Sequence, residues 1–241
     1  MKVTKKIDNT IAQLPDGSTF GYQEFNIQES EYPAATKAIE RLIKKGIINR
    51  ASTGLFYKPK QTVFGNLKPK EEELLKPYLF EQKKRVAYIT GTALFNKFGL
   101  TTQVPKNIKI ASRDRRIATK IGNIKVTSVK SYSDVADNNY YLLELLDVLK
   151  DFKTIPDADA DQTINFMLQK LESLTAKELE YTIKLALRYP PRVRAFLGAL
   201  LTKINPDRNL AVLKKSINPL STFEFGIAQS QLATINNWNI K

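Results

Sequence analysis

A row of cations near residue 40 has the spacing of a surface that contacts an anionic polymer. Lys37, Arg41 and Lys44 are separated by four and three residues, so in a helix they lie on one face. Their ammonium and guanidinium groups neutralise phosphates, and arginine also pairs with the edge of guanine. The opposite face carries a narrow apolar stripe formed by Ala35, Ile39, Leu42 and Ile43. The sequence therefore predicts a helix that buries one face and presents the other to nucleic acid.

A second basic cluster follows in the middle of the chain. Its strand-like alternation with isoleucines predicts a sheet with one charged face. That face could contact phosphates, RNA or an acidic protein, or it could simply be solvated. The candidate residues are Lys106, Lys109, Arg113, Arg115, Arg116, Lys120, Lys125 and Lys130.

The composition excludes several kinds of chemistry. The chain contains no histidine and no cysteine. Disulfides, thiolate or imidazole metal sites, and nucleophiles paired with histidine are therefore impossible. No Gly-rich phosphate loop occurs, and the carboxylates have no spacing typical of an acid–base pair. We expect no metal, no cofactor and no catalytic activity.

The elements around the first cationic row predict a winged helix-turn-helix domain over residues 1–60. Helical patterns cover residues 3–13 and 22–25, and a third helix begins after Ser30 as its N-cap and ends at Gly46. Short β-prone runs at residues 47–50 and 55–58 are joined by a Gly-containing loop at residues 51–54, as in a hairpin. Three helices followed by a hairpin make up a winged helix-turn-helix DNA-binding domain.

This arrangement assigns roles to individual side chains. The first half of a recognition helix reaches base edges, so the predicted base-reading residues are Tyr32, Thr36, Lys37 and Arg41. The end of the helix and the wing face the backbone of the duplex, so the predicted phosphate contacts are Lys44, Lys45, Arg50, Ser52, Thr53 and Lys58. The alternative is an exposed face whose charge serves only solubility.

The rest of the chain reads as an α+β domain with a helical C-terminal part. Residues 61–82 are predicted as a linker and a helix, and residues 206–241 as an irregular tail. Between them, residues 83–205 should contain a short helix at 91–98 capped by Thr90 and strands at 107–111, 117–121 and 124–129. Helices should follow at 135–152, 161–174 with Asp161 as N-cap, 175–188 with a Thr175–Glu178 capping box, and 193–204.

The net charge of +14 is concentrated in the first 130 residues. Residues 1–66 contribute +4, residues 67–130 contribute +10, and the remainder is neutral. This asymmetry favours an anionic partner, of which nucleic acid is the commonest. No stretch approaches the ~18 apolar residues of a membrane span, and the start of the chain lacks an apolar signal core. We therefore expect a cytoplasmic protein that does not enter a membrane.

Several segments in order resemble a known family. The winged-helix start, TGTALFNKFGLTTQVPKNIKI at residues 90–110, the Arg-rich hairpin and RYPPRVRAFLGALL at residues 188–201 are similar to AbiEi-type antitoxins. The resemblance covers about residues 1–205. It implies the transcriptional-regulator half of a type IV toxin–antitoxin, or abortive-infection, system. It further implies a winged helix that represses its own operon, a C-terminal domain needed for antitoxicity and a neighbouring gene for a nucleotidyltransferase-like toxin.

The sequence thus predicts a DNA-binding autorepressor that acts as an antitoxin, with its own operator as double-stranded DNA partner. Direct binding of the toxin is left open, because such antitoxins are often thought to act without a stable complex. Two alternatives differ in their partner. A general winged-helix regulator would bind DNA without any toxin, and an RNA- or protein-interaction module would use residues 106–130.

Overall fold

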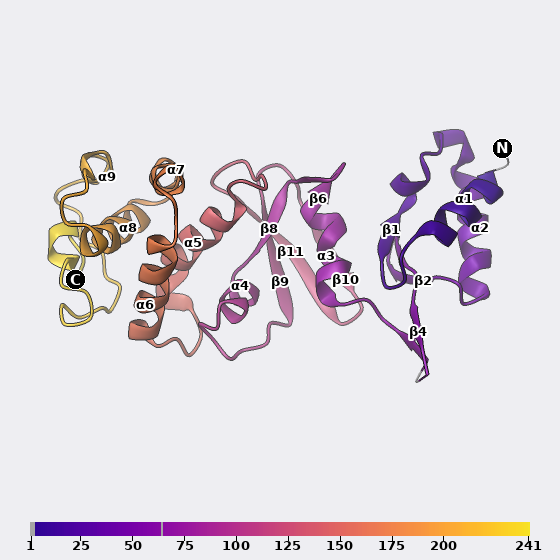
Figure 1. The fold of residues 1–241 in the computed structure, drawn as a ribbon, viewed down its shortest axis with the longest axis horizontal. Helices are drawn as coiled ribbons and strands as arrows, with labels where there is room; N and C mark the ends of the chain where they lie inside the picture. The colour runs from indigo at the N-terminus through magenta and orange to yellow at the C-terminus, as the bar shows by residue number, and fades with distance from the viewer. Residues whose placement is uncertain (1–2, 64) are drawn as a thin grey trace. The chain divides into compact units, whose positions relative to one another are not determined.

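The protein has a mixed α+β fold, as predicted, and forms two compact units. A computed structural model describes residues 3–63 and 65–241 (Figure 1). The first unit extends to Lys83 and also contains Ala118–Val126, whereas the second contains Lys84–Ile117 and Thr127–Lys241. The first unit is thus longer than the predicted domain of residues 1–60, and each unit has its own hydrophobic core.

The first unit begins with helices and a small sheet. Its elements in order are α1 (Val3–Gln13), β1 (Thr19–Gly21), the 3-10 turns η1 (Tyr22–Phe25) and η2 (Glu29–Glu31), α2 (Tyr32–Lys44), β2 (Asn49–Ser52) and β3 (Leu55–Tyr57). The predicted helix at residues 3–13 is confirmed. Ser30 was predicted as the N-cap of the next helix but lies inside η2, so Glu31 occupies the cap of α2.

The three strands form a sheet of order β1-β3-β2. Tyr57 in the central strand lies between Thr19 and Asn49, and a bulge follows Arg50. Strand β2 begins two residues later than predicted, because the amide of Ile47 is already used at the end of α2. It donates to Leu42 O at 3.1 Å while Gly46 N donates to Ile43 O at 2.9 Å, a Schellman motif with Gly46 at φ 70°.

Residues 60–79 form a hairpin and a helix that belong to the first unit. The hairpin consists of β4 (Lys60–Thr62) and β5 (Gly65–Leu67), and α3 (Glu71–Leu79) follows it. Helix α3 is fixed to the sheet, because Thr19 Oγ1 donates to Glu73 O at 2.7 Å and the Ser52 and Tyr78 hydroxyls lie 3.2 Å apart. Of the linker and helix predicted for residues 61–82, the helix is thus present as α3, and the segment predicted as a linker contains the two strands of the hairpin.

The next strands are β6 (Phe80–Glu81), β7 (Lys84–Arg85), β8 (Ala87–Thr90), β9 (Asn107–Ser112), β10 (Ala118–Ile121) and β11 (Ile124–Lys130). The last four form a sheet of order β10-β11-β9-β8, in which Ala87 pairs with Ser112 and Thr90 with Lys109. The predicted strands β9 to β11 are confirmed, and β8 was not foreseen. Thr90 ends β8 instead of capping a helix, and α4 (Thr92–Lys97) begins after Gly91.

Helices dominate the second unit after β11. They are α5 (Tyr140–Asp151), η3 (Phe152–Thr154), α6 (Ala160–Glu172), α7 (Ala176–Ala186), α8 (Pro191–Ile204), α9 (Ala211–Lys215) and η4 (Ile235–Trp238). The N-cap of α6 is Asp159, whose Oδ1 accepts from Gln162 N at 2.9 Å, and not the predicted Asp161. Among the helices that the structure describes, none has the length and apolar character of a bilayer span.

The last 36 residues are part of the core of the second unit and not a loose tail. In Figure 1 the C-terminal segment, drawn in yellow, lies beside α8. Leu213, Phe225 and Trp238 are buried in the same core as α5 and α8. Phe223 and Ile240 are joined by a parallel β-bridge. As predicted, residues 206–241 contain little regular secondary structure, with α9 and η4 as their helical elements among the described residues. They are nevertheless packed against the core of the second unit.

Replacement of Glu178 by Gln is expected to lower the thermal stability at neutral pH but not near pH 2. The predicted capping box is present, since Thr175 Oγ1 and N donate to the Glu178 carboxylate at 2.6 and 2.8 Å, and Tyr141 donates at 2.6 Å. These hydrogen bonds, with that of the Thr175 hydroxyl the strongest, lower the pKa of Glu178 from 4.5 to about 2.

A lowered folded-state pKa contributes stability above the unfolded-state pKa, and this stability is lost as the pH falls from 4.5 towards about 2. Thermal melts of the wild type and the Glu178→Gln variant from pH 7 to pH 2 measure the effect. A difference in Tm that stays constant over that range would contradict it.

Candidate nucleic-acid interface

Helix α2 presents a cationic face to solvent in the first unit. Ala35, Ala38, Ile39 and Leu42 are buried, because together with α1 and β3 they form the core of this unit. The other side of the helix is exposed and carries Lys37, Glu40, Arg41, Lys44 and Lys45. The amphipathic helix predicted from residue spacing is therefore present, with its apolar and charged residues on opposite sides.

The positive charge on this face is not neutralised within the first unit. Among the described side chains, no carboxylate lies within 4.0 Å of Lys37, Arg41, Lys44 or Lys45. The stretch from Arg41 to Lys70 contains eight Lys and Arg residues and no Asp or Glu. Unpaired exposed cations attract an anionic surface without first breaking an internal ion pair.

The first turn of α2 differs from what the sequence suggested. Tyr32 is 41% exposed, and its ring centroid lies 5.6 Å from that of Tyr22. Thr36 is half-buried, its hydroxyl donates to Tyr32 O at 3.0 Å, and Tyr22 donates to it at 3.4 Å. Because that hydroxyl is engaged inside the unit, the structure leaves Tyr32, Lys37 and Arg41 as exposed candidates for base contacts, and not Thr36.

The hairpin of β2 and β3 places some of the predicted wing residues at the surface. Arg50 is exposed, with its guanidinium carbon 5.7 Å from the Phe56 ring centroid, and Thr53 is exposed in the two-residue loop. Ser52 is half-buried and bonded to Tyr78. Lys58 pairs with Asp16 at 3.2 Å and donates to Leu14 O at 2.9 Å. The prediction of Ser52 and Lys58 as phosphate contacts is therefore not supported by their surroundings.

The second basic cluster is divided between the two units. Lys120 and Lys125 belong to the first unit, whereas Lys106, Lys109, Arg113, Arg115 and Arg116 belong to the second. All are exposed except Arg115, which is half-buried, and Arg113 Nη1 donates to Ser131 O at 3.3 Å. The Lys109 stem lies over Gly91, where a Cβ would come 3.2 Å from Lys109 Cδ. Lys109, Lys120 and Lys125 nevertheless lie on neighbouring strands of the β10-β11-β9-β8 sheet, whereas Arg113, Arg115 and Arg116 follow the end of β9. The predicted charged sheet face stays a prediction.

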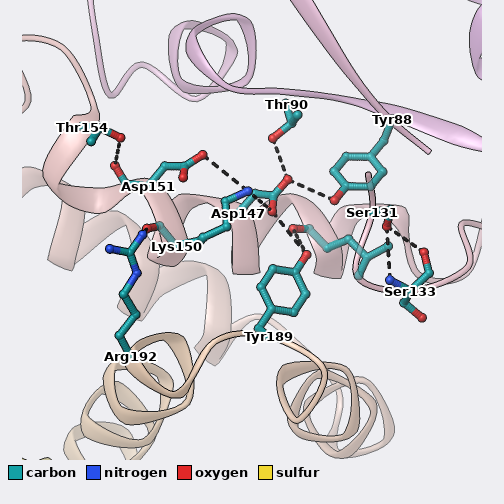
Figure 2. Close-up of polar contacts among 11 residues, drawn as sticks. Tyr88, Thr90, Ser131, Ser133, Asp147, Lys150, Asp151, Thr154, Tyr189 and Arg192 are labelled. Atoms are coloured by element: carbon teal, nitrogen blue, oxygen red, sulfur yellow. Dashed lines mark hydrogen bonds and ion pairs between the residues drawn. The ribbon is translucent and has the colours of Figure 1, made fainter. Parts of the chain in front are cut away.

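A buried carboxylate in the second unit was not anticipated from the sequence. Figure 2 shows Asp147 of α5 surrounded by donors from other elements. Its Oδ2 accepts from the hydroxyls of Tyr88 and Thr90 at 3.0 and 2.6 Å. Its Oδ1 accepts from Lys150 Nζ at 2.9 Å and from the Tyr189 hydroxyl at 3.3 Å. The Asp147 residue is 2% exposed, so these contacts replace its hydration.

The two tyrosines act as fixed donors in this cluster. Burial, with the nearby charge of Asp147, raises the pKa of Tyr88, and burial likewise raises the pKa of Tyr189. Both hydroxyls therefore stay protonated and keep donating to the carboxylate. Because both oxygens of Asp147 already accept two hydrogen bonds each, the arrangement fixes β8, α5 and the turn before α8 together. A clue in the sequence is an aspartate inside the leucine-rich run LLELLDVL.

Comparisons with known proteins give a family and a fold. A family model described as a family of unknown function (DUF6088) matches residues 6–179. No curated protein matches the sequence. The crystal structure of the Rv2827c protein from Mycobacterium tuberculosis is similar, with a TM-score of 0.54 over 93% of this chain and 85% of that chain. The two chains are 11% identical, so the likeness concerns the fold alone.

Proposed function

The chain belongs to the DUF6088 family, whose function is unknown, and we propose that it binds double-stranded DNA through a winged helix-turn-helix in its first unit. The observation that carries this proposal is the exposed face of α2, whose cations Lys37, Arg41 and Lys44 have no carboxylate partner among the described side chains. From Arg41 to Lys70 the chain then contains no acidic residue. The order of α1, β1, η1, α2 and the β2–β3 hairpin agrees with such a domain, with η1 in the place of its second helix.

In this proposal α2 enters the major groove with its exposed face towards the bases. Lys37 and Arg41 hydrogen-bond to base edges, where arginine prefers guanine O6 and N7. Lys44, Lys45, Arg50 and Thr53 lie nearer the backbone and contact phosphates. Affinity then comes largely from phosphate neutralisation, and it falls steeply as the salt concentration rises.

We further propose that the protein is a cytoplasmic autorepressor that acts as the antitoxin of a type IV toxin–antitoxin system, without catalysis. This part rests on the resemblance of residues 90–110 and 188–201 to AbiEi-type antitoxins. Its functional partner is a nucleotidyltransferase-like toxin encoded next to it. Rescue of growth when the chain is expressed together with that toxin separates an antitoxin from a general transcription regulator.

Combined replacement of Lys37 and Arg41 by Ala is expected to weaken operator binding by about 30-fold or more, since each base contact contributes ~1–3 kcal/mol. Fluorescence anisotropy with the DNA upstream of the gene, against a random duplex of equal length, measures the loss. The matched control is Lys177→Ala/Lys184→Ala, which removes two exposed lysines from α7 in the second unit.

The control variant should bind like the wild type. For the α2 variant, the slope of the logarithm of the binding constant against the logarithm of the salt concentration should decrease by the equivalent of about two phosphate contacts at most. Equal affinity of the wild type for upstream and random DNA would refute sequence-specific binding. Unchanged affinity of the α2 variant would refute the role of this helix.

A further inference from the structure

We infer that the β4–β5 hairpin is a second DNA-binding arm, which enters the minor groove beside the major-groove site of α2. This inference rests on the proposed function of the first unit. The hairpin begins at Lys60, three residues after β3 ends at Tyr57, and in Figure 1 it projects away from α1 and α2. It was not among the sites suggested by the sequence, where residues 61–69 resembled a linker.

The hairpin exposes nearly all of the side chains that the structure describes in it. Lys60, Gln61, Asn66 and Lys68 are exposed, and Val63 and Leu67 are 94% and 53% exposed. A two-stranded ribbon without a hydrophobic face is marginally stable in water by itself. A partner that covers Val63 and Leu67 would therefore stabilise the hairpin as well as bind to it.

The chemistry of the hairpin fits nucleic acid better than protein. No carboxylate among the described side chains lies within ion-pair distance of Lys60 or Lys68. Lysines also protect sheet edges from pairing with other chains, but acidic residues and proline serve that purpose too. The hairpin lies inside the stretch of 30 residues, Arg41 to Lys70, that has only basic charges. That bias favours phosphate contact over edge protection.

The strand register gives the hairpin one polar face. Gln61 is paired with Asn66, so the two carboxamides project from the same face, and Lys68 follows directly after β5 ends at Leu67. The other face carries Lys60 opposite Leu67. A carboxamide donates to the acceptors at the edge of an A·T pair in the minor groove, whereas the guanine 2-amino group obstructs the same position.

The dimensions agree with an arm that inserts at its tip. Three residues in each strand span roughly 10 Å at ~3.3 Å per residue, which exceeds the depth of the minor groove of ~7.5 Å. The two strand backbones are ~4.8 Å apart from centre to centre, and their atoms and side chains make the ribbon wider than the ~6 Å groove. Insertion therefore requires the groove to widen. Minor-groove proteins widen it by placing apolar side chains against the bases and bending the duplex. Val63, which follows β4 directly and is 94% exposed, can supply such an apolar contact.

The test compares three variants of the full chain on duplexes with the upstream DNA. The hairpin variant is Gln61→Ala/Asn66→Ala/Lys68→Ser, whose residues are exposed and therefore dispensable for folding, as circular dichroism can verify. The α2 variant Lys37→Ala/Arg41→Ala and the control Lys177→Ala/Lys184→Ala accompany it. Hydroxyl-radical footprinting reports on the minor groove, and anisotropy reports on affinity.

The wild type should protect a minor-groove segment beside the site of α2. The hairpin variant should lose that segment, keep the rest of the footprint and bind about tenfold more weakly, as expected for loss of one base contact with its phosphate contact. Duplexes whose flank beside the α2 site contains A·T or inosine·cytosine pairs should bind equally well, because both pairs lack the guanine 2-amino group. Duplexes with G·C pairs in that flank should bind at least about fivefold more weakly. The hairpin variant should not distinguish them.

Two outcomes overturn the inference, and they are distinguishable. A hairpin variant with the footprint, affinity and flank preference of the wild type, next to an α2 variant that fails to bind, would leave the proposed function standing without this arm. Inosine·cytosine flanks that behave like G·C would exclude the minor groove. A wild type that binds upstream and random DNA equally would remove the proposed function and the arm together.

Discussion

Asp147→Ala is expected to lower the free energy of unfolding of the second unit by about 3–5 kcal/mol. The carboxylate is 2% exposed and is the common acceptor for Tyr88, Thr90, Lys150 and Tyr189. Its removal leaves three hydroxyls without that acceptor in the interior and a lysine with a side chain only 19% exposed beside them. Each unsatisfied buried group costs about 1–3 kcal/mol, so the effect exceeds that of an ordinary surface substitution.

Urea unfolding followed by tryptophan fluorescence measures this effect in the full chain. The single tryptophan, Trp238, lies in the second unit, so its signal reports on that unit even if the two units unfold separately. The matched control is Asp151→Asn, one turn further along α5, whose carboxylate is 29% exposed and 3.6 Å from Lys150. It should change stability by less than about 1 kcal/mol.

An Asp147→Ala variant that unfolds at the urea concentration of the wild type would show that the cluster contributes little to stability. The stability of Asp147→Asn should lie between those of the wild type and Asp147→Ala. Its amide oxygen still accepts hydrogen bonds, but its NH2 group faces hydroxyls that can no longer donate to it. This ordering separates the loss of hydrogen bonds from the loss of side-chain volume.

Local signals in the sequence predicted the elements whose residues interact with near neighbours. The stripe from Ala35 to Ile43 and the glycine at residue 46 were enough to place α2 to within two residues at each end. The exposure of Lys37 and Arg41 follows from the same periodicity, because burying an unpaired charge is costly. These features depend on contacts within one helix and its cap.

The missed strands depend on partners far along the chain. Strand β1 has three residues, and its partner is β3, with Thr19 opposite Tyr57. Strand β8 has four residues and pairs with β9, after a helix and a loop. Runs this short do not show an alternating pattern that distinguishes them from loops. Only the pairing, which the sequence does not display, makes them strands.

The roles of several side chains were also decided by distant residues. Lys58 looked like a phosphate contact, but Asp16 and the end of α1 bind its ammonium group. The leucine-rich run around Asp147 suggests that this residue is buried, but it does not reveal the partners, because Tyr88 and Thr90 lie 59 and 57 residues before it. The role of a charged residue on an exposed helix face can thus be predicted from the sequence more securely than the role of a charged residue that contacts a distant part of the chain.

Trp238→Ala is expected to destabilise the second unit by about 3–5 kcal/mol, the usual cost of removing a buried aromatic side chain. Trp238 is 4% exposed, and its Nε1 donates to Thr202 Oγ1 at 2.9 Å. Its ring lies over Gly198 in α8, where a Cβ would come 2.3 Å from Cζ3 of the indole. Leu220→Ala, at a site 90% exposed, is the control in the same segment and should have no measurable effect.

The contact between Gly198 and Trp238 makes the effect of a second substitution depend on the first. Gly198→Ala alone should destabilise the unit by about 1–3 kcal/mol, because the new methyl group overlaps the indole ring. In the Trp238→Ala background the same change should cost little, since the ring is gone and alanine favours a helix over glycine by ~1 kcal/mol. Urea unfolding of the four proteins by circular dichroism gives the coupling energy. Strictly additive effects would mean that α8 bends to accept the methyl group, and that the C-terminal segment does not depend on this glycine for its packing.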